Sequence, residues 1–404
     1  MGENDGNGTM GDSVWDERSP GPPPPHRPTP QADPRPEGLI GPVVEPGHLP
    51  PPGPFVFGHP YGTQGIRLTD GTQRIEPVGM AYWPVINAHH GQDWIYLFLG
   101  EADGVHRWGI NKATLQAIRE DLVLGPGTGE GWAWDFRHPH ILYRPDGPRL
   151  LRVNAQDLTS EVLFDISDPF PGCRVWQCHT SRDGQTHSAT IERITREGPY
   201  ERIGCLTVRH GERRFFPAAG DFDECQIDQS GRWLLIKETV QAEEINRVLD
   251  LTRSDDHLGW IIHDADGAVG HSDMGEGYVI GEEDQAEPGG VFRQWDFTEE
   301  GPEDAGVIFD TDWTRMSRYL SHCNAPQPRV LITLASELWL VRLDAVHQET
   351  RIAPTLAHST DPQQPYERKP KASLDPSGEW ACWTADPTGS GQLEAFLVRL
   401  PRSV

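Results

Sequence analysis

Two of the four lysines in this 404-residue chain flank a single proline, as Lys369-Pro370-Lys371, just before the turn Asp-Pro-Ser-Gly. The other two lysines are Lys112 and Lys237, and arginine carries the basic charge elsewhere. A lysine ammonium is a compact, flexible cation with three hydrogen-bond donors, suited to neutralising an acidic group on a ligand or on the protein.

Polar side chains also stand at fixed distances before several other turns. Aligning the segments on their turns brings four polar residues to equivalent positions: His179, Gln226, His322 and Ser373, with His271 one step off because its turn is longer. His140, Glu224 and Lys371 fall two residues earlier, on the same side of their strands because side chains alternate along a strand. Imidazoles and an amide from separate strands can hold Mn, Fe or Zn, or supply a general base. Polar groups bound only to water are the structural alternative.

The turns used for this alignment recur along the chain. Between them lie short apolar runs such as "DWIYLFLG" (93–100) and "RWLLIKETV" (232–240), which are β-branched and aromatic and too short for helices. The turn aspartates are spaced by about 37 to 45 residues, with one gap of about two periods that holds the turn "NAPQP"; they are Asp103, Asp146, Asp183, Asp228, Asp273 and Asp375. A period of ~40–50 residues with three or four strands predicts a seven-bladed β-propeller. A double β-sandwich is the alternative all-β fold.

Three segments refine this prediction. Closure of the ring predicts that a strand within 55–79, "FVFG" or "GIRLT", completes the blade that carries "EAFLVRL" (394–400). Residues 111–122, "NKATLQAIREDL", are the one segment with a helical pattern. Residues 1–53 are rich in Pro and Gly and poor in aromatics, which predicts a disordered or extended arm before a propeller domain at 54–404.

Composition excludes several classes of function. The formal net charge is −26, with 61 acidic and 35 basic residues, which argues against nucleic acid or an anionic membrane surface as a partner. No apolar run approaches the ~20 residues of a membrane helix, and no secretory signal is visible, so the cytoplasm is the default location. Six cysteines without a CxxC spacing indicate neither a disulfide scaffold nor a zinc ribbon.

The C-terminal half also resembles known propellers. The segment "KASLDPSGEWACWTADPTGSGQLEAFLVRL" (371–400) resembles the last blade of TolB-like propellers. "CHTSRDG" (178–184) and "GHSDMGEGYVIGEE" (270–283) resemble segments of oligogalacturonate lyases, which are seven-bladed propellers of this type. The resemblance to these propellers covers roughly residues 170–400. The chain resembles even more closely a group of bacterial propellers for which no activity is established. The resemblance implies the propeller fold more specifically than it implies an activity.

The resemblance to the lyases implies a Mn ion held in the channel by histidines and a glutamine. The positions of this chain that match the ligands of the last blade are Lys369, Lys371 and Tyr366, and only His271 matches a remaining ligand. Because a protonated lysine cannot ligate a metal and repels one, no cofactor is expected. Mn or another divalent metal bound through His271 is the alternative.

The first hypothesis for function is a non-catalytic binding or interaction propeller with a polar channel able to bind an anionic ligand, for example an anionic oligosaccharide. Protein partners would bind the propeller faces or the proline-rich arm. If the lysines are structural, Glu224 is a candidate for their carboxylate partner. The residues expected to bind the ligand are His179, Gln226, Lys369 and Lys371.

The alternative hypothesis is a polysaccharide lyase that acts on oligouronates by β-elimination in the channel. The lysines would then neutralise the substrate carboxylate in place of the metal. His271 or His322 would be the base, and Tyr366 or Tyr278 the acid. The sequence favours the first hypothesis because the family's metal ligands are mostly replaced, and it leaves open whether the protein is an enzyme.

Overall fold

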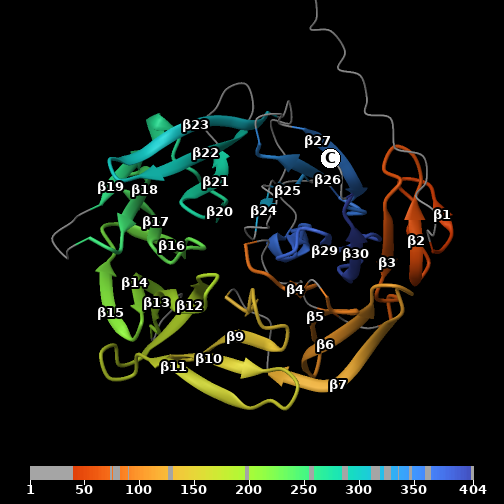
Figure 1. The fold of residues 1–404 in the computed structure, drawn as a ribbon, viewed down its shortest axis with the longest axis horizontal. Coiled ribbons are helices and arrows are strands. Elements are labelled where there is room, and N and C mark those ends of the chain that lie inside the picture. Colours follow the sequence, from red (N-terminus) through yellow and green to blue (C-terminus); the bar gives the residue numbers. More distant parts are fainter. Residues whose placement is uncertain are drawn as a thin grey trace, which may run out of the picture. The chain divides into compact units, whose positions relative to one another are not determined.

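The structure is a computed structural model. It describes residues 40–72, 75, 82–89, 91–125, 131–195, 200–253, 259–283, 290–310, 319–322, 329–334, 336–344, 348–359 and 365–401. These residues form seven largely antiparallel sheets that follow one another around a ring, so residues 32–404 contain a seven-bladed β-propeller (Figure 1). The predicted all-β propeller is confirmed, and the β-sandwich alternative is wrong.

Six blades are four-stranded sheets of consecutive strands. Blade 1 has β4 (Ile86–Asn87), β5 (Trp94–Glu101), β6 (Gly104–Asn111) and β7 (Ala117–Gly125); blade 2 has β8 (Ala133–Trp134), β9 (Ile141–Asp146), β10 (Arg149–Asn154) and β11 (Ser160–Asp165). Blade 3 has β12 (Cys173–Thr180), β13 (Thr186–Arg193), β14 (Glu201–Arg209) and β15 (Glu212–Pro217); blade 4 has β16 (Asp221–Ile227), β17 (Trp233–Val240), β18 (Glu243–Asp250) and β19 (Trp260–His263). Blade 5, after the short helix η1 (Asp264–Asp266), has β20 (Ser272–Met274), β21 (Tyr278–Glu283), β22 (Val291–Thr298) and β23 (Gly301–Asp310); blade 6 has β24 (Tyr319–Ser321), β25 (Arg329–Thr333), β26 (Glu337–Arg342) and β27 (Glu349–Pro354).

Blade 7 is built from both ends of the described chain. After the short helix η2 (Tyr366–Arg368) it takes β28 (Ser373–Leu374), β29 (Trp380–Ala385) and β30 (Glu394–Arg399) from the C-terminal side, and β1 (Val43–Val44), β2 (Gly53–Phe57) and β3 (Gln64–Arg67) from the N-terminal side. Strand β3 pairs antiparallel with β30, with Ile66 opposite Leu397. The predicted closure of the ring by an N-terminal strand is thereby confirmed.

The predicted N-terminal arm is described only in part. Residues 1–39 lie outside the described residues. Residues 40–53 include β1, which pairs in parallel with β2 at the outer side of blade 7. This last part of the proline-rich segment therefore contributes a strand to the sheet.

The predicted helix at 111–122 is wrong, because this segment forms a turn and the strand β7. The side-chain oxygen of Asn111 accepts the backbone N–H groups of Ala113 and Thr114, both at 3.0 Å, and reverses the chain after β6. Asparagine is favoured in such turns because its amide oxygen replaces a backbone acceptor. Strand β7 then pairs antiparallel with β6 along its length, and this pairing overrides the helical preference of the segment.

The recurring Asp-x-x-Gly turn has a local cause. In blade 7 the carboxylate of Asp375 accepts the backbone N–H groups of Glu379 at 2.8 Å and Trp380 at 2.7 Å. The carboxylate of Asp228 accepts the N–H groups four and five residues ahead, both at 2.9 Å, in blade 4. Gly378 has a φ of 71°, which an L-residue with a Cβ rarely adopts. The turn therefore needs both its aspartate and its glycine.

Apolar side chains pack between neighbouring blades and hold the ring together. The largest fully buried side chains include the indoles of Trp83, Trp134, Trp380 and Trp383. A lone four-stranded blade could not cover both of its faces, so this burial depends on closure of the ring. Among the described residues, no helix has the length and apolar character that crossing a lipid bilayer requires.

Candidate functional site

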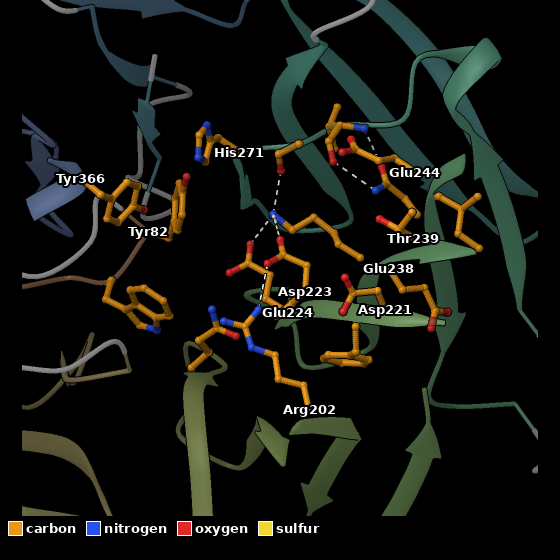
Figure 2. A pocket seen from close by; sticks show the side chains of 18 residues that line it. Tyr82, Arg202, Asp221, Asp223, Glu224, Glu238, Thr239, Glu244, His271 and Tyr366 are labelled. Carbon is orange, nitrogen blue, oxygen red and sulfur yellow. Dashed lines mark hydrogen bonds and ion pairs between the residues drawn. The ribbon is translucent and has the colours of Figure 1, made fainter. Parts of the chain in front are cut away.

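A pocket of ≈ 560 Å³ lies beside the inner strands of blades 3 and 4. One side of it is aromatic: Tyr82 and Trp83 come from the segment before β4, and Tyr366 from η2. The opposite side is formed by carboxylates of blade 4, among them Asp221 and Glu238 (Figure 2). Segments far apart in the sequence, from blades 1, 4 and 7, thus converge on one cavity.

Tyr82 is the most unusual residue of the aromatic side. It is only 4% exposed, and its hydroxyl has no hydrogen-bond partner among the described residues. Burial raises the pKa of Tyr82 well above its ordinary value, so the group is a neutral phenol with an O–H to donate. The His271 ring stacks on it with the centroids 6.3 Å apart and lies 4.7 Å from the ring of Tyr319. A buried hydroxyl costs free energy unless a partner satisfies it, so this position favours a ligand.

Lys237 lies at the base of the pocket. Its ammonium pairs with the carboxylate of Glu224 and donates to the carbonyl of Gly270 at 2.6 Å. Glu224 also accepts from Nε2 of Gln226 at 2.9 Å, and the same amide donates to the carbonyl of Ser272 at 2.8 Å. Lysine and glutamate are both at least 95% buried. This network connects blades 4 and 5 and fixes the Glu224 carboxylate at the pocket.

The lining carries more acidic than basic side chains. Arg202 pairs with Asp223 at 3.0 Å, and Oε1 of Glu238 forms an ion pair with Nη2 of Arg247 at 3.0 Å. Five carboxylates line the pocket, on Asp221, Asp223, Glu224, Glu238 and Glu244, against the two cationic side chains of Arg202 and Lys237. The cations that line the pocket are each paired with a carboxylate. We therefore expect the pocket to favour a neutral or cationic ligand over an anionic one.

Of the two lysines that flank Pro370, Lys371 contacts η2 and two tyrosine rings. The ammonium of Lys371 donates to the carbonyls of Tyr366 at 2.6 Å and Lys369 at 3.4 Å, and lies 3.9 Å from the centroid of the Tyr366 ring. It is also 5.4 Å from the ring centroid of Tyr319. Cation–π contacts and hydrogen bonds thus hold η2 against the inner strand. Lys371 orients Tyr366, which is 43% exposed and lines the pocket, and neither lysine is part of the lining itself.

His322 lies away from this pocket, inside blades 5 and 6. Its Nδ1–H donates to the carbonyl of Arg329 at 2.6 Å, and the hydroxyl of Tyr278 donates to Nε2. Burial lowers the pKa of His322 to about 4, so the imidazole is neutral at pH 7. Both ring nitrogens are engaged with the protein, which indicates a structural residue.

The alignment of His322 was one residue out of register. Ser321 is the residue that matches Ser373, because the hydroxyl of Ser321 accepts the N–H of Leu374 across the blade boundary, and both serines pair with the second strands of their blades. The sequence after His322 lacks an Asp-x-x-Gly turn, so the alignment had no reliable anchor there.

The remaining predicted residues are divided between the pocket and the interior. His179 is buried against Trp83, with ring centroids 4.9 Å apart, and its Nε2 makes no hydrogen bond within the part of the chain that the structure describes. Burial, followed by the nearby charge of Lys237, lowers the pKa of His179 to about 3. It lines a second, small cavity of ≈ 20 Å³ beneath the Tyr82–Trp83 segment. Of the residues singled out in the sequence, Glu224, His271 and Tyr366 line the main pocket, and Gln226 is hydrogen-bonded to Glu224.

Sequence reasoning missed Tyr82, Lys237 and Arg202. Lys237 did carry a signal, because it interrupts the apolar run "RWLLIKETV" of an inner strand, where an unpaired charge would be costly. Tyr82 lies outside any repeat and had no comparable signal. The pocket joins residues from blades whose relative placement the sequence does not reveal.

The residues that would correspond to the metal ligands of similar propellers do not fit a metal here. A lysine ammonium has no lone pair to donate, and that of Lys371 is packed against Tyr366. His271 Nδ1 lies 3.1 Å from Oε2 of Glu282, which leaves at most one further nitrogen for a ligand.

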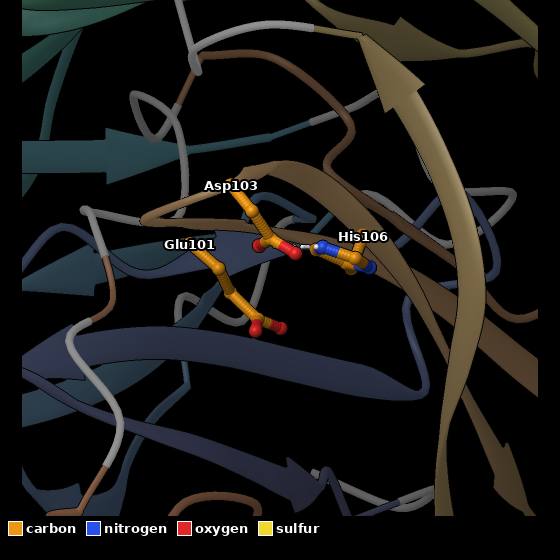
Figure 3. A group of neighbouring side chains, drawn as sticks. All are labelled: Glu101, Asp103 and His106. Atoms are coloured by element: carbon orange, nitrogen blue, oxygen red, sulfur yellow. Dashed lines mark hydrogen bonds and ion pairs between the residues drawn. The ribbon is translucent and has the colours of Figure 1, made fainter.

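One other group of side chains has the composition of a metal site. Glu101, Asp103 and His106 converge on the hairpin between β5 and β6 (Figure 3). The guanidinium of Arg119 already lies among them, with Nε 2.9 Å from Oε2 of Glu101 and Nη2 3.0 Å from Nε2 of His106. Because this arginine supplies the positive charge that a cation would, we interpret the cluster as an ion-pair network of blade 1.

Comparisons with known proteins identify the fold. No family model and no curated protein sequence matches the chain. Among solved structures, an oligogalacturonate lyase from Vibrio parahaemolyticus is 11% identical with a TM-score of 0.54, covering 87% of this chain and 96% of that one. A structure titled as an oligogalacturonate lyase in complex with manganese is 14% identical with a TM-score of 0.56, covering 89% and 99%. TolB from Acinetobacter baumannii is 9% identical with a TM-score of 0.39, covering 83% and 65%.

The predicted resemblance to this type of propeller is confirmed for the fold. At these identities the similarity shows the fold alone, because propellers of one architecture host unrelated functions.

Proposed function

We propose that this protein is a binding propeller whose pocket, between the Tyr82 aromatic side and the carboxylates of blade 4, binds a neutral polyhydroxylated molecule such as a sugar. The observation that carries the proposal is Tyr82, which lines the pocket and whose buried hydroxyl makes no hydrogen bond to the residues that the structure describes. A ligand hydroxyl would accept its hydrogen bond and remove the cost of burying it unpaired.

The rest of the lining supports a sugar. Aromatic rings offer apolar faces to the C–H groups of a sugar ring, and the carboxylates of Asp221 and Glu244 offer acceptors for its hydroxyl groups. A volume of ≈ 560 Å³ lies within the range of small-molecule sites. The pocket thus offers both the apolar surface and the hydrogen-bond acceptors that a sugar ring requires.

The excess of carboxylates in the pocket disfavours an anionic ligand. Lys371 makes its contacts with η2 and the tyrosine rings, and Lys237 is paired with Glu224. A uronate carboxylate would face five lining carboxylates and two cations that are already paired. Binding of an anionic oligosaccharide, and β-elimination on it, is therefore the less supported alternative. Of its two candidate bases, His271 lines the pocket and His322 does not.

Titration calorimetry tests the proposal. The panel is glucose, galactose, mannose, xylose, glucosamine and galacturonate, and we expect a neutral sugar to bind more tightly than galacturonate. Tyr82→Phe should weaken the best ligand about three- to tenfold, the equivalent of one hydrogen bond. Tyr61→Phe is the matched control, because that hydroxyl bonds to Glu337 in another part of the molecule, at 2.7 Å. If no sugar binds, or if galacturonate alone binds, the proposal is wrong.

A further inference from the structure

His271 lies at the pocket with one ring nitrogen held by a buried carboxylate. Its Nδ1 is 3.1 Å from Oε2 of Glu282, whose side chain is only 5% exposed. Since an ionised carboxylate only accepts, Nδ1 donates its hydrogen, and the lone pair of the neutral imidazole lies on Nε2. The His271 side chain is 41% exposed and lines the pocket. A carboxylate paired with an imidazole in this way orients it as a general base.

The backbone places these two residues opposite each other. The carbonyl of His271 accepts the N–H of Glu282 at 2.8 Å, and the carbonyl of Glu282 accepts the N–H of Gly270 at 2.8 Å. These bonds continue the antiparallel ladder between β20 and β21 beyond Ser272. The ring of Tyr319 lies against the imidazole, with the centroids 4.7 Å apart. The orientation of the His271 ring is therefore fixed by contacts with both Glu282 and Tyr319.

A proton donor lies beside this imidazole. The ring of Tyr82 stacks on that of His271 with the centroids 6.3 Å apart, and both side chains line the pocket (Figure 2). The Tyr82 hydroxyl makes no hydrogen bond to the described residues. Burial raises the pKa of Tyr82, so this phenol gives up its proton only to a strongly basic oxygen such as an alkoxide. The pocket thus brings a general base and a general acid side by side.

The chemistry of a neutral sugar decides which reaction such a pair serves. A neutral sugar has no carboxylate next to a C–H group, so a histidine base acts on its hydroxyl hydrogens. The hydroxyl at C1 is the most acidic of them, because C1 also carries the ring oxygen. Removing its proton supplies the electron pair that breaks the bond from C1 to the ring oxygen. The ring oxygen then needs a proton, which a neighbouring acid donates.

From this arrangement we infer that the protein interconverts the α and β anomers of its sugar, with His271 as the base and Tyr82 as the acid. This inference rests on the proposed function. Nε2 of His271 takes the proton of the C1 hydroxyl, a C1=O double bond forms, and the bond from C1 to the ring oxygen breaks. The ring oxygen takes the proton of the Tyr82 hydroxyl. The open-chain aldehyde turns about its C1–C2 bond, and the reverse steps close the other anomer and return both protons.

The charges that form during this reaction are compensated within the site. Ring opening leaves an imidazolium on His271 and a phenolate on Tyr82, and these opposite charges lie on neighbouring rings. The Glu282 carboxylate stabilises the imidazolium through the hydrogen bond to Nδ1. Glu282 is thus a positioning residue, because it acts through His271 and does not itself line the pocket.

Polarimetry measures the activity. Freshly dissolved α-D-glucose, α-D-galactose, α-D-mannose or α-D-xylose is mixed with the full chain in dilute buffer, and the change of optical rotation is followed. We expect the rate to rise in proportion to the protein concentration for at least one sugar. His271→Gln and Tyr82→Phe should each lower kcat at least tenfold, beyond any loss of binding. Glu282→Gln should lower kcat several-fold with KM little changed, because it removes the charge behind the imidazole and no group that lines the pocket.

His263→Gln is the matched control. Nδ1 of His263 lies 2.8 Å from Oε1 of Glu243, in a second histidine–carboxylate pair that does not line the pocket, so this substitution should leave the rate unchanged. Methyl α-D-glucoside has no C1 hydroxyl and should slow the reaction of glucose by competition. If sugars bind but their anomers equilibrate no faster, or if His271→Gln keeps the full rate, the inferred activity is refuted while the proposed function stands. If no sugar binds, both are refuted.

Discussion

The neutral, fully buried imidazole of His322 makes the stability of the propeller depend on pH in a predictable direction. The pKa of His322 is about 4 in the folded protein, against an ordinary value of 6.5. When the pH falls below 6.5, the unfolded chain takes up a proton that the folded protein refuses, so stability falls with pH. The contribution is fully present above pH 6.5 and is lost progressively as the pH approaches 4.

The size of the effect follows from the two pKa values. With about 1.4 kcal/mol for each pH unit between them, His322 contributes about 3 kcal/mol in total. About 2 kcal/mol of this is lost between pH 7 and pH 4.5. His187, with a pKa of about 4, and His179, with a pKa of about 3, change stability in the same direction. The free energy of unfolding of the parent protein therefore falls by more than the contribution of His322 alone.

Urea unfolding at pH 7 and pH 4.5, followed by tryptophan fluorescence, measures the effect. His322→Asn keeps a donor for the Arg329 carbonyl but cannot take up a proton, so its free energy of unfolding should fall by about 2 kcal/mol less than that of the parent between these pH values. Tyr278→Phe keeps the buried imidazole and should retain the parent's pH dependence. An unchanged pH dependence in His322→Asn would refute the assignment of a buried neutral imidazole.

Three more predictions concern stability and the pocket. Lys237→Met should lower the free energy of unfolding by about 3–5 kcal/mol, because it leaves the Glu224 carboxylate buried without its cation, and the double variant with Glu224→Gln should recover part of the loss in denaturant titrations. Asp375→Ala should cost about 2–3 kcal/mol, measured in the same way, because it removes the acceptor of several turn N–H groups. Lys371→Met should weaken the binding of the best sugar several-fold, because losing a cation–π contact worth about 0.5–1 kcal/mol releases η2. Lys369→Met is the control and should leave the affinity unchanged. Equal effects of the two variants in calorimetry would contradict the role given to Lys371.

Much of the fold could be predicted from the sequence because the propeller repeats its local signals. The aspartate of each Asp-x-x-Gly turn, such as Asp228, bonds to its own turn, so the same residues recur wherever the turn does. The helix expected at 111–122 failed because the pairing of β7 with β6 is a contact that no local pattern announces. Strand pairing within a blade decided the structure there.

Less of the site could be predicted, since it depends on how segments meet across the ring. Alignment on the turns predicted that polar groups gather near the inner strands, and His271 lines the pocket. The alignment did not show that the Lys371 ammonium packs against the ring of Tyr366. Nor did it show that Tyr82, from a segment outside the repeat, lines the pocket. The positions of these residues in the sequence do not indicate that they lie close together in the folded protein.

The central claim, that the unpaired Tyr82 hydroxyl serves a polyhydroxylated ligand, is tested most directly by the stability that a saturating sugar adds to the parent protein and to Tyr82→Phe. Without sugar, we expect the variant to be more stable by about 1 kcal/mol or more, because it no longer buries an unsatisfied hydroxyl. With sugar, the gain in the free energy of unfolding should be smaller for the variant than for the parent. Equal gains in the two proteins, or a variant that is less stable without sugar, would contradict the claim.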